Sequence, residues 1–128
     1  MTPVELTVVV PTYNERDNVE PLVQALHTHL GGCAWEVVFV DDDSPDGTAA
    51  KVREIAQRMP MVRSLHRLGR RGLSTAVIEG IMASTAPYVA VIDGDLQHDP
   101  VLLPRMLDIL RDGAFDIVIG SRYVDGGE

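Results

Sequence analysis

Short apolar runs rich in β-branched residues alternate with helical segments along this chain, and this alternation constrains the fold more than any other feature. The runs predicted to be buried strands are 6–10, 37–40, 62–65, 89–92 and 117–119. Segments with helical periodicity lie between them, at 19–30, 48–58, 73–84 and 101–111. The βαβαβαβαβ order predicts an α/β, Rossmann-like fold with a mainly parallel sheet, right-handed crossovers and helices on both faces.

Helix-start and helix-stop residues support these boundaries. Asp17 or Asn18 precedes the first predicted helix, and Asp99-Pro100 precedes the fourth. Gly31 and Gly113 follow the first and fourth helices, where a left-handed residue commonly ends a helix. We therefore expect four separate helices of ordinary length.

Size and composition predict a single soluble domain. The chain has 128 residues, of which 45% are hydrophobic and 23% charged, and no segment approaches the ~20 apolar residues of a membrane span. The N-terminus lacks the pattern of a secretory signal, and the single Cys33 excludes an internal disulfide, so we expect a reducing, cytoplasmic location. A net charge of -8 argues against nucleic acid as a partner.

Polar clusters follow every predicted strand. They occupy positions 11–15, 41–47, 68–72, 93–97 and 121–123. Because ligands of open parallel sheets bind outside the carboxyl ends of the strands, these clusters are expected to form one ligand-binding edge.

Asp93 and Asp95 are the best metal candidates on this edge. If the backbone there stays extended, both side chains point to the same side, and Gly94 between them leaves the backbone open to a ligand. Two convergent carboxylates favour a cation, and oxygen ligands suit Mg²⁺ or Mn²⁺. A solvated turn is the alternative; Asp99 is better interpreted as a helix cap and His98 as an exposed turn residue.

Other residues of the edge keep more than one interpretation. One of Asp41, Asp42 and Asp43 could accept hydrogen bonds from a base or a ribose, but the residues themselves do not rank the three. Ser44 and Asp46 fit structural roles in a turn. Tyr13 could stack on a base or cover the core. The side chains that could clamp a diphosphate, or could be ordinary surface charges, are Arg70, Arg71 and Arg122.

Taken together, the stretches VVVPTYNERDNV, EVVFVDDDSPDGT, GRRGLSTAVIEGI, VAVIDGDLQHDP and DIVIGSRY resemble the family 2 glycosyltransferases of the GT-A fold. Within that family they are most similar to the dolichyl-phosphate or polyprenyl-phosphate mannosyltransferases. The resemblance runs from Leu6 to Tyr123. It implies a metal-dependent, inverting transfer of a sugar from a nucleotide donor, GDP-mannose or alternatively a UDP-sugar, to a polyprenyl or dolichyl phosphate.

The resemblance also implies roles for individual residues. The set that would bind the nucleotide sugar is Pro11, Tyr13, Glu15, Val40, Asp42, Asp93, Gly94, Asp95, Gln97 and Arg122. Asp93 and Asp95 match the DxD motif of the family, with Gly94 where alanine is common, and Gln97 corresponds to a further metal ligand. Asp95 and Arg122 are the expected catalytic residues, the latter near the sugar and diphosphate. An acceptor phosphate, with a second pKa of about 6, is largely ionised at neutral pH, so no general base is required.

Family members continue well beyond 128 residues. We expect residues 1–123 to be the nucleotide-sugar-binding part of a GT-A catalytic domain that is incomplete at its C-terminus, and 124–128 to be a flexible polar tail. The acceptor half is then largely missing, so the chain could bind donor without turnover. An open sheet edge could pair with another copy. In a longer form, we expect contact with the cytoplasmic face of a membrane.

Two rival classes make different predictions. A phospho-receiver signalling domain needs an acidic pair after the first strand and a lysine after the fifth, where this chain has Tyr13-Asn14-Glu15 and Ser121-Arg122. A dinucleotide oxidoreductase needs G-x-G-x-x-G after the first strand, which is absent. A third alternative is a binding-only remnant of a glycosyltransferase.

Overall fold

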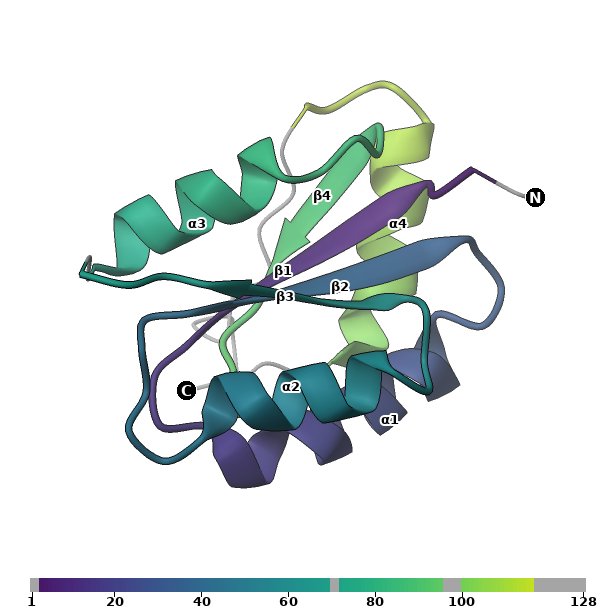
Figure 1. The fold of residues 1–128 in the computed structure, drawn as a ribbon. Helices are drawn as coiled ribbons and strands as arrows, with labels where there is room; N and C mark the ends of the chain where they lie inside the picture. The colour runs from purple at the N-terminus through teal and green to yellow at the C-terminus, as the bar shows by residue number, and fades with distance from the viewer. Residues whose placement is uncertain (1–2, 70–71, 96–99, 117–128) are drawn as a thin grey trace, which may run out of the picture.

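The computed structural model describes residues 3–69, 72–95 and 100–116 (Figure 1). Strands and helices alternate in the predicted order. The elements are β1 (Leu6–Thr12), α1 (Arg16–His29), β2 (Trp35–Asp41), α2 (Thr48–Ala56), β3 (Val62–His66), α3 (Leu73–Met82), β4 (Tyr88–Val91), a 3₁₀ turn η1 (Pro100–Leu102) and α4 (Leu103–Arg111). The predicted strand 117–119 and tail 124–128 lie outside the described residues.

The four strands form one parallel sheet in the order β3-β2-β1-β4. The chain therefore moves outward from β1 through β2 to β3, and then returns to place β4 on the other side of β1. Right-handed crossovers in opposite directions put their helices on opposite faces of a sheet. The predicted fold class, a Rossmann-like parallel sheet with helices on both faces, is confirmed.

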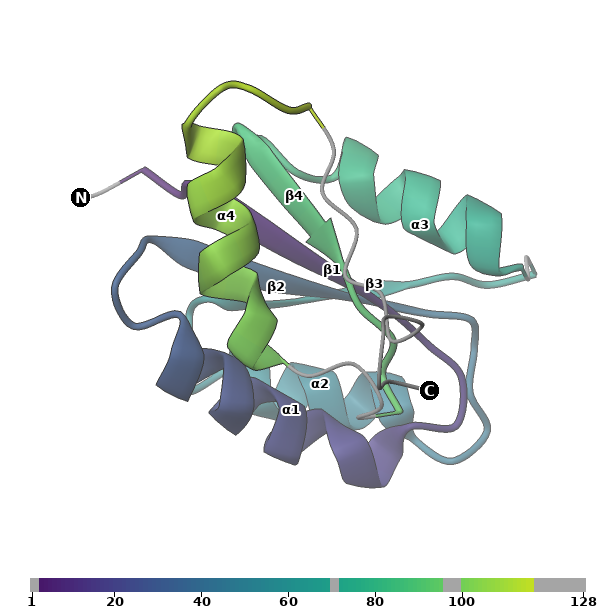
Figure 2. The ribbon, with the colours of Figure 1, turned by 180° about the vertical axis from the view of Figure 1, so that it is seen from behind.

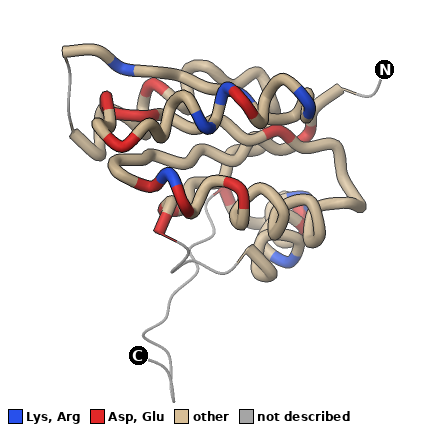
Figure 3. The backbone as a smooth tube through the Cα atoms, turned by 60° about the horizontal axis from the view of Figure 1, so that its bottom comes forward, with Lys and Arg blue, Asp and Glu red and all other residues tan. Residues whose placement is uncertain are grey.

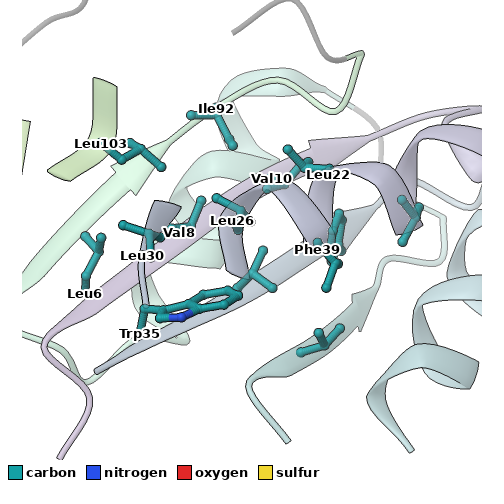
Figure 4. Close-up of a cluster of buried hydrophobic side chains, with 14 of the residues drawn as sticks. Leu6, Val8, Val10, Leu22, Leu26, Leu30, Trp35, Phe39, Ile92 and Leu103 are labelled. Carbon is teal, nitrogen blue, oxygen red and sulfur yellow. The ribbon is translucent and has the colours of Figure 1, made fainter. Parts of the chain in front are cut away.

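Figures 1 and 2 show α1, α2 and α4 on one face of the sheet and α3 on the other. Alternate residues of the strands supply the two cores, as the two-residue period of a strand requires. The larger core lies under α1, α2 and α4 and is shown in Figure 4; it includes Leu6, Val8, Val10, Val37, Phe39, Leu22, Leu26, Ile55 and Leu107. The smaller core under α3 consists of Val9, Val38, Val40 and Ala76. None of the described helices has the length and apolar character that a membrane span requires.

Helix α3 lies very close to the sheet at Gly80. A Cβ atom at this position would overlap Cγ1 of Val9 and lie 3.0 Å from Cγ2 of Val40. Glycine is an unfavourable residue in a helix interior, so its presence here is explained by this close approach.

Two polar pairs connect β1 to β2 at the two ends of their shared ladder. Thr7 lies opposite Glu36, and its hydroxyl donates to Glu36 Oε2 at 2.7 Å; Thr12 lies opposite Asp41 and donates to Oδ1 at 2.8 Å. The hydroxyl of Ser84, just after α3, in turn donates to Thr7 Oγ1 at 2.7 Å. Both pairs are buried, and hydrogen bonding is what makes burial of such groups tolerable.

The boundaries differ from the prediction at a few places. α1 begins at Arg16, ahead of the expected 19, so Asp17 and Asn18 lie in its first turn and neither is its cap. Gly113 follows α4 with φ +78, as expected of a left-handed residue after a helix. β4 ends at Val91, before Asp93, although the backbone N–H of Ile92 still donates to Val9 O at 3.1 Å.

Candidate functional site

The carboxyl ends of the parallel strands meet at one edge of the sheet, as predicted. We name this the carboxyl edge and define it by the described residues 11–16, 41–48, 66–69, 72 and 92–95. Acidic residues gather on this side of the molecule (Figure 3). The strand order reverses between β1 and β4, and such a switch point is where open α/β sheets bind ligands.

Asp93 and Asp95 lie at this switch point, beside the end of β1. A Cβ atom on Gly94 would lie 3.0 Å from Cγ2 of Thr12 and 3.3 Å from Cγ of Glu15, so the backbone between the two acids packs directly against β1. Asp93 is half-buried and Asp95 exposed. Gly94 and Asp95 form a turn, so the extended backbone under which both side chains would point to the same side is not present.

The residues of this turn fit a divalent cation by their donor chemistry. Two carboxylates supply hard oxygen ligands, and Mg²⁺ and Mn²⁺ commonly take one or two of these and complete their shell with water and phosphate oxygens. Among the described residues no group of three or more His, Cys, Asp or Glu side chains is placed to enclose a metal. The third predicted ligand, Gln97, lies outside the described residues.

The Asp41 carboxylate is committed to the loops around it. Its Oδ1 accepts hydrogen bonds from the hydroxyls of Thr12 (2.8 Å) and Ser44 (2.6 Å), and its Oδ2 accepts from the Ser44 N–H at 2.9 Å. Only 1% of the residue is exposed. Ser44 also accepts from the backbone N–H of Asn14 at 2.8 Å. Asp41 therefore ties the loop after β1 to the loop after β2, and it is a structural residue.

Asp42 is held differently. Its Oδ2 accepts the backbone N–H of Gly72 at 3.0 Å, and its Oδ1 lies 3.2 Å from Nε of Arg67. The residue is 9% exposed, and its Oδ1 is buried. In the sequence, Arg67 is one of several arginines between the two acidic clusters. Nothing in its local pattern separates it from a surface arginine, although it directly follows β3 and is itself only 3% exposed.

Asp43 completes the separation of the three neighbouring acids. It is exposed, has φ +55, and pairs with Nε2 of His66 at 2.9 Å. The sequence alone does not rank Asp41, Asp42 and Asp43, but the structure separates them. Asp41 is buried and connects two loops, Asp42 is nearly buried and paired with an arginine, and Asp43 is a surface residue.

The remaining predicted nucleoside residues come from β1, its following loop and β2. Tyr13 is 42% exposed, whereas Pro11 and Glu15 are half-buried. Glu15 Oε2 accepts from the Asn18 side chain at 2.6 Å. Val40 lies directly opposite Pro11 in the ladder, but its side chain is fully buried under α3, so it offers no exposed side-chain surface to a ligand.

Asp46 has the structural role that the sequence suggested. Its Oδ1 accepts from the N–H of Thr48 at 3.0 Å and also from the Thr48 hydroxyl, and its Oδ2 accepts from the N–H of Arg16 at 3.2 Å. Burial raises the pKa of Asp46, but these hydrogen bonds outweigh that effect, and the net result is a pKa below its usual range. The carboxylate thereby binds the first backbone N–H group of α2 and the first of α1.

Several predicted residues lie outside the described part of the chain. These are Gln97 and Arg122, together with Arg70, Arg71, His98 and Asp99. Their roles stay predictions. The structure does bring Pro11, Tyr13, Glu15, Asp42, Asp93, Gly94 and Asp95 to one edge, whereas Val40 contributes a buried side chain.

The strand order separates the rival folds. Receiver domains share the flavodoxin-like order 2-1-3-4-5, in which the third strand lies next to the first. Here β1 lies between β2 and β4, and β3 lies on the far side of β2, away from β1. The receiver alternative is therefore excluded. The order agrees with the Rossmann type, but the β1 loop lacks the glycines that bind a dinucleotide.

Comparison with known proteins gives one consistent result. The dolichol-phosphate mannosyltransferase of Pyrococcus furiosus is 43% identical over 124 residues, covering 97% of this chain and 35% of that protein. The dolichol-phosphate mannosyltransferase of Saccharomyces cerevisiae is 36% identical over 126 residues, covering 96% and 46%. The chain thus spans between about a third and about half the length of these relatives.

A solved structure supports the same assignment. Mannosyltransferase PcManGT from Pyrobaculum calidifontis, in complex with GDP-Man and Mn²⁺, is 30% identical with a TM-score of 0.64, covering 74% of this chain and 28% of that one. The family model for glycosyl transferase family 2 matches residues 7–128. Because that match covers nearly the whole chain, the chain belongs to glycosyl transferase family 2.

Proposed function

We propose that this chain is the donor-binding part of a polyprenyl-phosphate mannosyltransferase, which transfers mannose from GDP-mannose to a dolichyl or polyprenyl phosphate with inversion. The observation that carries the proposal is the placement of Asp93-Gly94-Asp95 against the end of β1, at the switch point of a family 2 sheet. The names of the relatives, dolichol-phosphate mannosyltransferases, and the GDP-Man and Mn²⁺ of the solved neighbour support the choice of donor, acceptor and metal.

Different residues of the carboxyl edge would contact different parts of the donor. Tyr13 is exposed, as an aromatic ring that stacks on a base must be, and Asp42 would accept a hydrogen bond from the base or the ribose through Oδ2, because its Oδ1 is buried. Pro11 and Glu15 line the same loop, next to the turn that contains Gly94. The nucleoside would therefore lie across the ends of β1 and β2.

Asp93, Asp95 and Gln97 would hold a divalent cation, Mg²⁺ or Mn²⁺, beside the diphosphate. When bound, such a cation neutralises negative charge on a leaving nucleoside diphosphate. Asp95, the exposed member of the pair, is the proposed catalytic ligand, and Arg122 is proposed to bind the sugar and diphosphate. Transfer to a phosphate acceptor would require no general base, because the phosphate is already anionic at neutral pH.

The acceptor and the membrane would be met mainly by parts of a longer protein. β4 is an edge strand among the described residues, and Val91 on it is 43% exposed. We propose that this edge pairs with further sheet or with a second copy, as unprotected edge strands tend to do. Location at the cytoplasmic face of a membrane follows from a polyprenyl-phosphate acceptor and is part of the same proposal.

Isothermal titration calorimetry of the full chain tests the donor site. GDP and GDP-mannose should bind in the presence of Mn²⁺, and more weakly after the metal is removed with EDTA. Asp95→Ala should abolish the effect of Mn²⁺, because it removes one of two carboxylate ligands. Asp108→Ala is the matched control, since Asp108 is an exposed acid on α4 and should leave binding unchanged.

The results separate the alternatives. Binding of UDP and UDP-sugars in preference to GDP would replace the donor in this proposal. Donor binding without transfer to a polyprenyl phosphate, by a longer protein containing this chain, would identify a binding-only remnant. A nucleotide affinity that changes neither with Mn²⁺ nor in Asp95→Ala would overturn the proposed function.

A further inference from the structure

Asp42 belongs to an ion cluster centred on the buried Arg67. Arg67 Nε lies 3.2 Å from Asp42 Oδ1 and 3.0 Å from Glu79 Oε2 of α3, and Nη2 donates to the Thr75 hydroxyl at 2.8 Å. The backbone N–H of Arg67 donates to Asp41 O at 2.8 Å, which continues the ladder between β2 and β3. One arginine thus connects the ends of two strands to the helix on the α3 face.

This cluster fixes the plane of the Asp42 carboxylate. Among the described residues, Oδ1 faces Arg67 Nε in an ion pair and Oδ2 accepts a hydrogen bond from the Gly72 N–H. A carboxylate oxygen has about two acceptor positions, so Oδ2 keeps one for a ligand after its contact with Gly72, whereas Oδ1 is buried beside Arg67. The preceding residue, Asp41, already accepts three hydrogen bonds from Thr12 and Ser44 and is almost fully buried.

The cluster is not optimised as a purely structural ion pair. Within the described residues, Arg67 Nη1 is buried without a hydrogen-bond partner, and Asp42 Oδ1 faces Nε at ion-pair distance without forming a hydrogen bond. Buried polar groups in folded proteins are almost always hydrogen-bonded, so an incomplete set at a ligand edge calls for an explanation. Orienting a neighbouring carboxylate for a ligand provides one.

We propose that Arg67 is a positioning residue of the nucleoside site, which acts by holding the Asp42 carboxylate in the orientation that reads the base or ribose of a nucleoside diphosphate. The inference rests on the proposed function above. It goes further by assigning recognition to a residue that touches no ligand. Its consequence is specific: losing Arg67 must weaken the discrimination that Asp42 provides, and must leave the metal-dependent contact through Asp95 in place.

The test uses calorimetry of the full chain with Mn²⁺ and three probes: GDP, 2′-deoxy-GDP and IDP, which lacks the amino group of guanine. Asp42→Asn first identifies which probe pair Asp42 distinguishes. Arg67→Met combined with Glu79→Gln keeps the net charge of the cluster at its original value while removing the guanidinium. We expect this double variant to lose about tenfold in GDP affinity, as for a hydrogen bond to a charged group, and to lose discrimination between the same probes.

Two further variants make the test specific. Arg67→Lys keeps a cation that can pair with one carboxylate at a time, so it should restore part of the affinity and of the discrimination. Arg63→Gln is the matched control: Arg63 lies on β3, just before Arg67 in the chain, and it pairs with the β2 acid Glu36 at 3.1 Å and contacts Ala83 O just after α3, but it lies toward the opposite edge of the sheet. It should leave probe discrimination unchanged.

The outcomes are distinct. Wild-type chain that binds no GDP with Mn²⁺ overturns the proposed function and this inference with it. Wild-type binding together with unchanged probe discrimination in the folded Arg67 variants, as checked by circular dichroism, overturns this inference alone. Equal effects of the Arg63 and Arg67 variants would also overturn it, because they would indicate a general loosening of α3. Loss of discrimination confined to the Arg67 variants and Asp42→Asn supports it.

Discussion

Replacing Gly80 by alanine should destabilise the fold, although the same change in an isolated helix would stabilise it. The helix preference favours alanine over glycine by about 1 kcal/mol. In this structure the added Cβ would overlap Cγ1 of Val9 and lie 3.3 Å from Cγ2 of Val9 and 3.0 Å from Cγ2 of Val40. Both valines are fully buried on central strands, and β-branched side chains have few alternative rotamers.

The size of the stability loss in Gly80→Ala depends on how far α3 must move to accommodate the added methyl group. α3 has to shift away from the sheet, and a gap of even ~0.5–1 Å removes a quarter to a half of the dispersion energy of each contact it opens. Overpacking of this kind costs about 1–3 kcal/mol, and a direct overlap with a rigid strand belongs at the upper end. After subtraction of the helix preference, we expect a net loss of about 2 kcal/mol in the free energy of unfolding.

Urea denaturation followed by circular dichroism measures this change. Gly32→Ala is the control, because no atom lies within 4 Å of a Cβ there, and it should change stability by less than about 0.5 kcal/mol. Val9→Ala combined with Gly80→Ala should show a favourable coupling energy, since the smaller partner relieves the overlap. A Gly80→Ala variant as stable as the wild type would refute the close packing of α3 on β1.

Three further predictions address individual side chains. Asp41→Asn should lower the free energy of unfolding by about 2 kcal/mol in a denaturant titration, because it turns an amide group toward donors, whereas the exposed Asp43→Asn should have little effect; equal effects would contradict the loop tie. The lowered pKa of Asp46 stabilises the fold above the ordinary carboxyl pKa of about 3.9, and this contribution is lost as the pH falls through the lower folded-state value. The stability difference between wild type and Asp46→Asn should therefore shrink below about pH 4, and a difference independent of pH would argue against it. Burial raises the pKa of the Cys33 thiol, with a smaller contribution from Glu5, so its reaction with a disulfide reagent at pH 8 should be slower than that of glutathione.

The alternation of strands and helices could be predicted because each element carries its own signal. Valine-rich runs such as the one in β2 indicate buried parallel strands without any knowledge of their neighbours. The chain direction of the crossovers then places all carboxyl ends at one edge, so the location of the candidate site followed as well. The ends of elements were less predictable: α1 starts at Arg16 because Asp46 and Thr48, some thirty residues away, bind the backbone at its start.

The individual roles within the edge could not be predicted from local pattern. Residues 41 to 43 are three consecutive aspartates, and they differ only in the tertiary contacts that the fold gives each of them. Arg67 lies among other arginines in the sequence, and its burial depends on Glu79 of the following helix and Asp42 of the preceding strand. Long-range partners of this kind have no signature in a single sequence.

The threonine–acid pairs between β1 and β2 have a consequence for strand alignment. Strands composed of valine on both faces could slide past one another by two residues and still bury apolar side chains on the same faces. Thr7 with Glu36 and Thr12 with Asp41 oppose this, because a slide of two residues in either direction would take both buried carboxylates away from their hydroxyls and set one of them opposite a valine. Since Tyr13 and Asp42 are the residues that directly follow Thr12 and Asp41, the same two pairs set the spacing between the aromatic ring and the acid proposed to contact one nucleoside.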